Sequence, residues 1–254
     1  MKKKHIAIMG QSRAGTTMFY NMMRGSLQGF QFLEHEQTAA QTIKNPRGSF
    51  CTKRPLDVFA MQEILDGNLV RKELDVILCV RDPRSLLTSK HKAVPDDYFM
   101  DADKMYFIDQ ARGVAQKTLP GLLVVDQQIR AILDQQEAFG YRVFLLRYED
   151  LVANPDQVQT ALSEQMGYRF SGSFSDFHKA AIPEQLAGPL NGIRPVDQDN
   201  AVKWQDESKR KRLIEQFSKF PGLFNILQAY GYEEGTDWFK KMLEAEFGDL
   251  PQDV

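Results

Sequence analysis

The sequence is poor in cysteine and has no excess charge of either sign. Its two cysteines, Cys51 and Cys79, lie in separate apolar runs without CxxC spacing, which argues against a disulfide framework or a zinc site. A reducing compartment is the simplest expectation. The 32 lysines and arginines against 34 aspartates and glutamates give a net charge of -2, so no global positive field attracts nucleic acid or an anionic membrane. Any bound anion must therefore be held by a local site.

Long hydrophobic runs are also missing. The apolar run behind the basic N-terminal residues covers only Ile6 to Met9, which is too short for a signal peptide. No stretch approaches the ~20 apolar residues that span a bilayer. No segment is of low complexity, and no unit of ~20–50 residues repeats, which excludes repeat arrays. We therefore expect a cytoplasmic protein without a membrane span.

What is present is the composition of an ordinary globular protein. Of its 254 residues, 43% are apolar and 26% are charged. This length allows one large α/β domain or two small ones. Because the sequence contains no convincing domain boundary, we expect a single domain over residues 1–254.

Strand-like apolar runs alternate with helical segments along the chain. The expected strands cover 4–10, 30–34, 49–53, 74–80 and 141–147. The expected helices cover 16–24, 56–65, a segment from Pro83 through Ser89 and His91, 122–139, the residues after Pro155, 207–220 and the C-terminal segment 224–247, whereas 167–203 is irregular. The run at 74–80 is continuously apolar, as in strands covered on both faces. We therefore expect an α/β fold, a three-layer sandwich around a central parallel sheet, with ligands at the carboxyl ends of the strands.

The loop after the first strand, GQSRAGTT at 10–17, has the two-glycine frame of phosphate-binding loops. Gly10 and Gly15 let backbone N–H groups turn toward an anion, and the N-terminus of the following helix adds partial positive charge. The usual lysine is missing, since Thr16 stands in its place and Arg13 supplies the charge instead. A nucleotide triphosphatase needs that lysine and a bound Mg²⁺. The loop therefore predicts an anion that is bound without a metal, with threonine hydroxyls as additional donors.

Three segments, in this order, resemble the sulfotransferases that use 3′-phosphoadenosine 5′-phosphosulfate (PAPS), in their carbohydrate-type or bacterial branch. The family's loop for the 5′-phosphosulfate is matched by GQSRAGTT (10–17), and its 3′-phosphate segment by VRDPRSLLTSKH (80–91). A family segment after a later strand is matched by RYEDLVANP (147–155). The late loop that closes over the nucleotide resembles GIRPVDQDNAVKW (192–204).

This resemblance implies a P-loop nucleotide-hydrolase-like fold, with a nucleotide-binding core at 4–155 and a helical part with a lid loop at 156–254. It implies in-line transfer of a sulfuryl group from PAPS to a hydroxyl or amine of a small-molecule or carbohydrate acceptor, without a metal. The sequence departs from the family at Ala14, where the family has Ser or Gly, so one possible hydroxyl contact is lost. Neither the acceptor nor the oligomeric state is predicted.

The resemblance also assigns residues to the donor. Arg81 at a strand end and Ser89 about two helical turns later match the family's pair for the 3′-phosphate, and Arg194 is the candidate for a second contact with it. The alternative for Arg81 is a strand-end charge that pairs with Asp82 or Asp150. The residues expected to bind the donor are Gly10, Gln11, Ser12, Arg13, Ala14, Gly15, Thr16, Thr17, Arg81, Ser89 and Arg194.

For catalysis the resemblance implies positive charge near the leaving group and a base near the acceptor. Arg13 matches the loop cation, and Lys53 resembles the lysine that follows a strand in carbohydrate-type members. An exposed strand-end lysine is the alternative for Lys53. In those members the base is a glutamate shortly after the second strand, which points to FLEHEQT (32–38). Alternation in an extended segment places Glu34 and Glu36 on one face.

Glu36 is the favoured base because it lies nearest to the carboxyl end of the strand, where partial desolvation suits a proton acceptor. Glu34 and His35 stay open as bases, and the alternative for Glu36 is a simple pair with Lys53. Two other function classes stay open as well. One is a Mg²⁺-dependent P-loop nucleotide kinase or phosphotransferase, which the glycine frame allows and the missing lysine opposes. The other is a non-catalytic nucleotide-binding protein.

Overall fold

The structure is a computed structural model, and it forms two compact units. The first comprises Met1–Arg81 and Gln128–Gln198, and the second comprises Asp82–Gln127 and Asp199–Val254. The residues that the structure describes are 2–89, 106–107, 118–179 and 196–248. Arg194 and His91 lie outside the described residues. The single domain expected from the sequence stays a prediction.

The first unit is built on a parallel sheet. Its five strands have the order β2-β3-β1-β4-β7, and every neighbouring pair is parallel. The strands are β1 (Lys4–Gly10), β2 (Gln31–Phe32), β3 (Phe50–Lys53), β4 (Glu73–Val80) and β7 (Arg142–Arg147). The predicted central parallel sheet is thus confirmed, although the second strand is much shorter than the expected 30–34.

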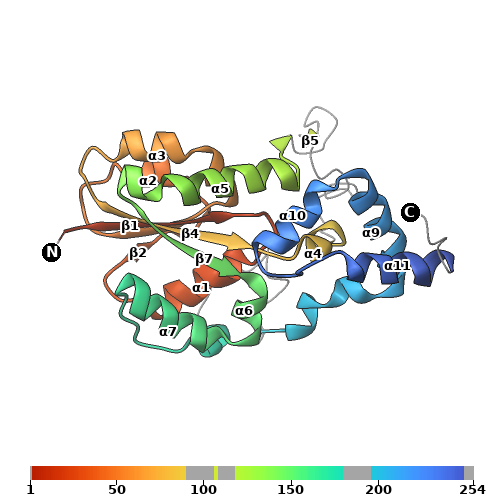
Figure 1. The fold of residues 1–254 in the computed structure, drawn as a ribbon. Coiled ribbons are helices and arrows are strands. Elements are labelled where there is room, and N and C mark those ends of the chain that lie inside the picture. The colour runs from red at the N-terminus through yellow and green to blue at the C-terminus, as the bar shows by residue number, and fades with distance from the viewer. Residues whose placement is uncertain (1, 90–105, 108–117, 180–195, 249–254) are drawn as a thin grey trace. The chain divides into compact units, whose positions relative to one another are not determined.

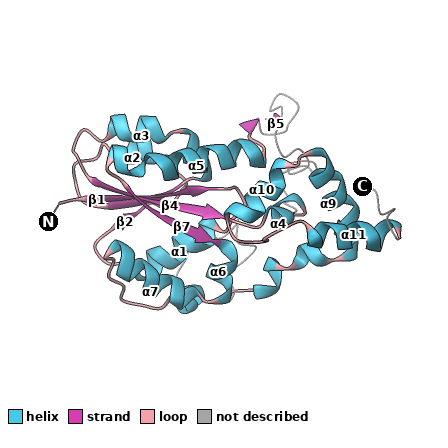
Figure 2. Ribbon diagram, in the orientation of Figure 1, coloured by secondary structure: helices cyan, strands magenta, loops and turns pink. Residues whose placement is uncertain are grey.

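Helices cover both faces of this sheet (Figures 1 and 2). One face carries α1 (Thr16–Ser26), α6 (Tyr148–Ala153) and α7 (Pro155–Met166). The other carries α2 (Ala39–Thr42), α3 (Met61–Gly67) and the later part of α5 (Leu122–Phe139), which begins in the second unit. The predicted three-layer α/β sandwich is therefore confirmed.

The central strands owe their position to their apolar sequence. β1 is buried from His5 to Gly10 and β4 from Leu74 to Val80, as expected for strands with helices on both faces. Asp75 is a polar exception within β4, and it is satisfied by Arg142 and by the hydroxyl of Tyr168 at 2.8 Å. β1 and β4 pair in parallel with Gly10 opposite Cys79, so their carboxyl ends lie next to each other.

Both cysteines belong to this interior. Cys51 in β3 and Cys79 in β4 are fully buried free thiols. Burial raises the pKa of the Cys51 thiol, because the charged thiolate is poorly solvated in the core. These cysteines therefore act as small apolar side chains.

The second unit is mainly helical. It contains α4 (Pro83–Leu87), α9 (Arg210–Lys219), α10 (Gly222–Ala229), α11 (Asp237–Phe247) and an antiparallel pair of β5 (Tyr106–Phe107) and β6 (Thr118–Leu119). The helix expected at 207–220 starts with a 3₁₀ turn, and the segment 224–247 divides into two helices. The β5–β6 pair was not predicted, because two-residue strands carry no readable alternation.

The helix after Pro83 ends earlier than the sequence predicts. Asp82 caps α4 by accepting from the Arg84 N–H at 2.8 Å, as expected for Asp before Pro. At the other end, the Thr88 hydroxyl donates to the Arg84 carbonyl at 2.8 Å and so satisfies a group that the next helical turn would use. The helix stops at Leu87, and Ser89 is not helical.

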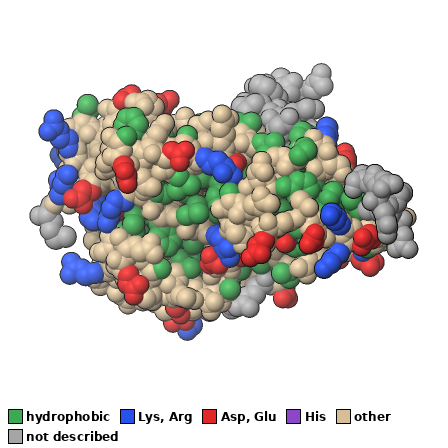
Figure 3. Space-filling view, viewed as in Figure 1, with side chains coloured by type: hydrophobic (Ala, Val, Ile, Leu, Met, Phe, Trp, Pro, Cys, Tyr) green, Lys and Arg blue, Asp and Glu red, His purple; other side chains and the backbone are tan. Residues whose placement is uncertain are grey.

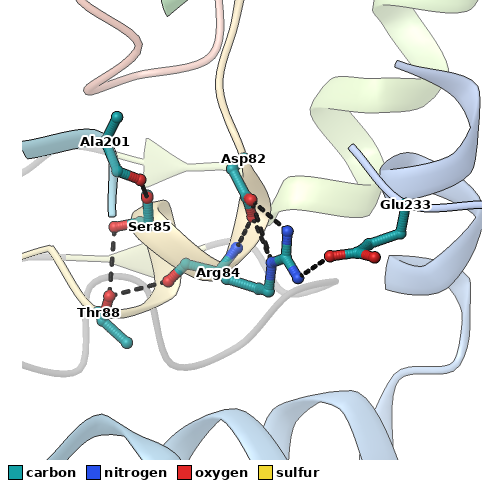
Figure 4. A network of polar contacts seen from close by, with 6 residues as sticks. All are labelled: Asp82, Arg84, Ser85, Thr88, Ala201 and Glu233. Atoms are coloured by element: carbon teal, nitrogen blue, oxygen red, sulfur yellow. Dashed lines mark hydrogen bonds and ion pairs between the residues drawn. The ribbon is translucent and has the colours of Figure 1, made fainter. Parts of the chain in front are cut away.

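A polar network fixes α4 within the second unit (Figure 4). The Arg84 guanidinium pairs with the Asp82 carboxylate at 2.7 Å and with Glu233 at 2.5 Å. It also lies over the rings of Trp204, 3.8 Å from the centroid, and Trp238. Two carboxylates and two aromatic faces account for the charge of this arginine. Arg84 is therefore a structural residue.

Charges are mixed on the surface. The face shown in Figure 3 carries both acidic and basic side chains, in agreement with the near-neutral net charge. Among the described helices, none has the length and apolar character needed to cross a membrane.

Candidate functional site

Two glycines shape the loop between β1 and α1. Gly10 has φ +131°, and a Cβ there would lie 2.2 Å from the Cys79 carbonyl oxygen. Gly15 has φ +77°, and a Cβ there would lie 2.6 Å from the ring of Tyr148. Backbone conformation and close neighbours both demand glycine at these positions. The two glycines of the sequence motif therefore occupy positions whose geometry requires glycine.

The loop leads directly into the N-terminus of α1. Gly15 is the residue before the helix, and no side-chain hydrogen bond caps this end among the residues described. The first N–H groups of a helix carry partial positive charge, and an anion is a natural partner for them. Arg13 has φ +68°, a left-handed conformation that costs a non-glycine residue about 1–2 kcal/mol. Strain of this kind often marks functional loops.

The remaining loop residues divide by exposure. Ala14 is 2% exposed and packs into the apolar core. Its methyl group therefore suits this position, where the sulfotransferases that the sequence resembles have Ser or Gly. Thr16 is buried at the start of α1, while Ser12 and Thr17 are partly exposed.

Lys53 connects this loop to the segment after β2. It is the last residue of β3 and pairs in register with Ile8 of β1, so it lies at the carboxyl end of the sheet. Its Nζ donates to the Thr17 hydroxyl at 3.1 Å and pairs with the Glu36 carboxylate at 2.5 Å. Only 6% of the Lys53 side chain is exposed. The alternative of an exposed strand-end lysine is therefore wrong.

Glu36 is placed differently from the expectation. β2 ends at Phe32 and the chain bends at Glu34 and His35, so the alternation argument for Glu34 and Glu36 does not apply. Glu34, His35 and Glu36 are all exposed, and Glu36 keeps 47% of its side chain accessible. Of these three residues, Glu36 is the one that the structure joins to Lys53.

Hydrogen bonds hold the Glu36 segment at both ends. On one side, the buried Tyr20 hydroxyl accepts from the Leu33 N–H at 2.7 Å and donates to its carbonyl at 2.8 Å. On the other side, the Asp57 carboxylate accepts from the Ala39 N–H at 2.7 Å. Burial raises the pKa of Asp57, and its hydrogen bonds oppose the rise. The position of Glu36 is thus set by two side chains from other elements.

Arg81 lies beside the loop at the end of β4. Its guanidinium donates to the Arg13 carbonyl at 3.1 Å and lies over the Tyr148 ring, 4.1 Å from the centroid. Its backbone N–H donates to the Gln11 side chain at 2.7 Å. The structure therefore brings Arg81 to the loop, and its role toward the 3′-phosphate stays a prediction. Ser89 is partly buried in the second unit, and its N–H donates to the Leu86 carbonyl.

Tyr148 is a site residue that the sequence analysis did not single out. It begins α6 directly after β7, and its ring contacts both Arg81 and the Gly15 position. Burial raises the pKa of its hydroxyl, whereas the charge of Arg81 opposes that rise. Its place in the segment 147–155, which carries part of the family resemblance, was the available signal.

Of the comparisons with known proteins, only the one with solved structures found matches. No protein-family model and no curated protein matches the chain. A solved structure, the "Sulfotransferase Domain from the Curacin Biosynthetic Pathway", has a TM-score of 0.51 and 15% identity, and the match covers 80% of this chain and 90% of that one. Mouse sulfotransferase SULT7A1 complexed with PAP has a TM-score of 0.50 and 12% identity, with 96% and 89% covered. The fold of this chain is therefore that of the sulfotransferases.

Proposed function

We propose that this protein is a PAPS-dependent sulfotransferase. The observation that carries the proposal is the position of Lys53, which contacts both the glycine-framed loop at Thr17 and the carboxylate of Glu36. The proposal is supported by this contact, because a buried cation, the glycine-framed loop and an accessible carboxylate then meet within the first unit. The sulfotransferase fold and the complex of the mouse relative with PAP support the choice of donor.

Donor binding would rest on the loop and on Arg81. The N–H groups at the start of α1 and the Arg13 side chain would hold the 5′-phosphosulfate, with the Thr16 and Thr17 hydroxyls as further donors. Arg81 would bind the 3′-phosphate, with Ser89 and Arg194 as additional donors. In this assignment the positive charges of a few local side chains bind the anionic donor. A protein with a net charge of -2 needs such a local site, because its overall field does not attract a polyanion.

The transfer step would use the Lys53–Glu36 pair. Glu36 takes the proton of the acceptor hydroxyl or amine, and the acceptor atom forms a bond to sulfur. The bond between sulfur and the bridging phosphate oxygen breaks, and its electron pair stays on the phosphate of the leaving nucleotide. Lys53 and Arg13 stabilise the negative charge that develops there. The accessible face of Glu36 suits an acceptor that arrives from solvent. We extend the proposal to small-molecule or carbohydrate acceptors, a metal-free reaction and a cytoplasmic location.

A ligand-dependent melting experiment tests the proposal. A ligand that binds the native state raises the melting temperature, Tm. We expect adenosine 3′,5′-bisphosphate (PAP) to raise Tm without Mg²⁺. A rise with ATP and Mg²⁺ alone would instead favour the kinase, which the glycine frame also allows. A rise with PAP but no sulfuryl transfer from PAPS to a panel of alcohols, amines and sugars would favour a non-catalytic nucleotide-binding protein.

A further inference from the structure

Gln11 joins the loop to the end of β4 through both its backbone and its side chain. Its N–H donates to the Cys79 carbonyl at 2.9 Å, and its side-chain Oε1 accepts from the Arg81 N–H at 2.7 Å. The ladder between β4 and β7 ends at Val80, so Arg81 is the first residue beyond the sheet. Gln11 therefore supplies the hydrogen bond that a neighbouring strand would otherwise give to Arg81.

The Nε2 amide nitrogen of Gln11 makes no hydrogen bond to any residue that the structure describes. The residue is fully buried, with 0% of its surface exposed. A buried donor without a partner is costly, and buried polar groups are normally satisfied. An anion bound at Arg81 would accept from this N–H group. The neutral amide suits this place, because a carboxylate with the same shape would offer no donor and would repel the anion.

We propose, on the basis of the proposed function, that Gln11 is a positioning residue for the 3′-phosphate of the donor. Its Oε1 sets the position of Arg81, and its Nε2 donates to the same phosphate. The Arg81 guanidinium in turn donates to the Arg13 carbonyl at 3.1 Å. This hydrogen bond links the proposed 3′-phosphate site at the end of β4 to the proposed 5′-phosphosulfate site in the loop. Gln11 thus makes recognition of the 3′-phosphate depend on the loop that binds the 5′ end.

The test compares PAP with adenosine 5′-monophosphate, which lacks the 3′-phosphate. Gln11→Met keeps the size of the side chain and removes its amide. We expect at least a tenfold higher Kd for PAP in titration calorimetry and less than a twofold change for the monophosphate. Gln157→Met, at an exposed position of α7, is the matched control and should change neither value. An equal loss for both ligands, or no loss for PAP, would overturn the proposal.

Two further variants separate the roles of the amide. Gln11→Met combined with Arg81→Ala should bind PAP more weakly than Arg81→Ala alone, but by a smaller factor than Gln11→Met costs in the wild type, because the positioning of Arg81 no longer matters once its guanidinium is gone. Gln11→Glu keeps the acceptor for the Arg81 N–H but loses the donor, and should also bind PAP at least tenfold more weakly. Wild-type affinity in Gln11→Glu would contradict the donor role, and it remains informative if Gln11→Met does not fold. The part of the proposed function on which this inference rests is the binding of PAP, and its failure is distinguishable, because the wild type itself would then not bind PAP.

Discussion

Lys53 and Glu36 form an ion pair at 2.5 Å, although they lie 17 residues apart in the sequence. The two partners differ in environment, since 6% of the Lys53 side chain is exposed against 47% for Glu36. A half-exposed pair of this kind contributes at most about 1 kcal/mol to stability. Its importance is therefore expected in catalysis, where it would keep a buried cation next to an accessible carboxylate.

Replacing Lys53 by methionine should lower turnover far more than stability. Loss of a fixed charge at a developing anion typically costs about 10²–10³-fold in kcat. We expect this loss in Lys53→Met with PAPS and a responsive acceptor, measured at saturating donor. Lys44→Met, at an exposed lysine, is the control and should keep wild-type turnover. Unchanged kcat in Lys53→Met would remove Lys53 from the mechanism.

Replacing Glu36 by glutamine should separate the base from the binding of the donor. General-base catalysis is worth about 10²–10⁴-fold, so kcat should fall by that factor while the Kd for PAP changes little. Glu34→Gln and His35→Gln test the open alternatives in the same segment. If one of them lost turnover while Glu36→Gln kept it, the assignment of the base would pass to that residue.

Gly15→Ala tests the close contact between the loop and Tyr148. A Cβ at Gly15 would lie 2.6 Å from the Tyr148 ring, whereas one at Gly140 would meet nothing within 4 Å. The two glycines have similar positive φ, +77° and +69°, so Gly140→Ala measures the backbone cost alone, about 1–2 kcal/mol. We expect Gly15→Ala to lose clearly more unfolding free energy and to bind PAP more weakly. If Gly15→Ala and Gly140→Ala lost the same unfolding free energy in urea denaturation, the contact with Tyr148 would not contribute to the cost of Gly15→Ala.

The burial of His5 leads us to expect that the folded protein loses stability in acid. This residue is buried in β1, where its Nε2 lies 3.0 Å from the Thr52 hydroxyl. Burial, together with the charge of Lys72, lowers its pKa from 6.5 to about 3. Between these values the unfolded state binds a proton that the folded state rejects, so stability falls as pH decreases from about 6.5 toward 3.

The non-titrating variant His5→Gln measures this contribution. Over that pH range the wild type should lose up to about 1.4 kcal/mol per pH unit more than the variant, which is the limit for one proton. Urea denaturation at several pH values gives both slopes. Parallel slopes would mean that the imidazole is protonated in the folded state as readily as in the unfolded state.

The sequence identified the elements whose pattern is local and strong. The buried strands β1 and β4, the helices α1 and α5, and the glycine frame of the first loop are all found where they were expected. Continuous apolar runs bounded by glycine or proline are sufficient to define such elements. The predicted lengths of the second strand and of the helix after Pro83 were wrong. β2 covers only part of the expected 30–34, and α4 ends at Leu87, where the Thr88 hydroxyl donates to the Arg84 carbonyl, a contact that periodicity does not reveal.

The sequence by itself determined the α/β class and the glycine-framed loop after the first strand, and it supplied the candidate residues, because these depend on composition and on spacing along the chain. Only the tertiary structure decided that Lys53 is buried, that it joins Thr17 to Glu36, and that Tyr148 contacts Arg81. The physical reason is that these contacts link segments that are distant in sequence. Packing of the sheet and its helices brings them together, and no local pattern encodes which side chains then meet.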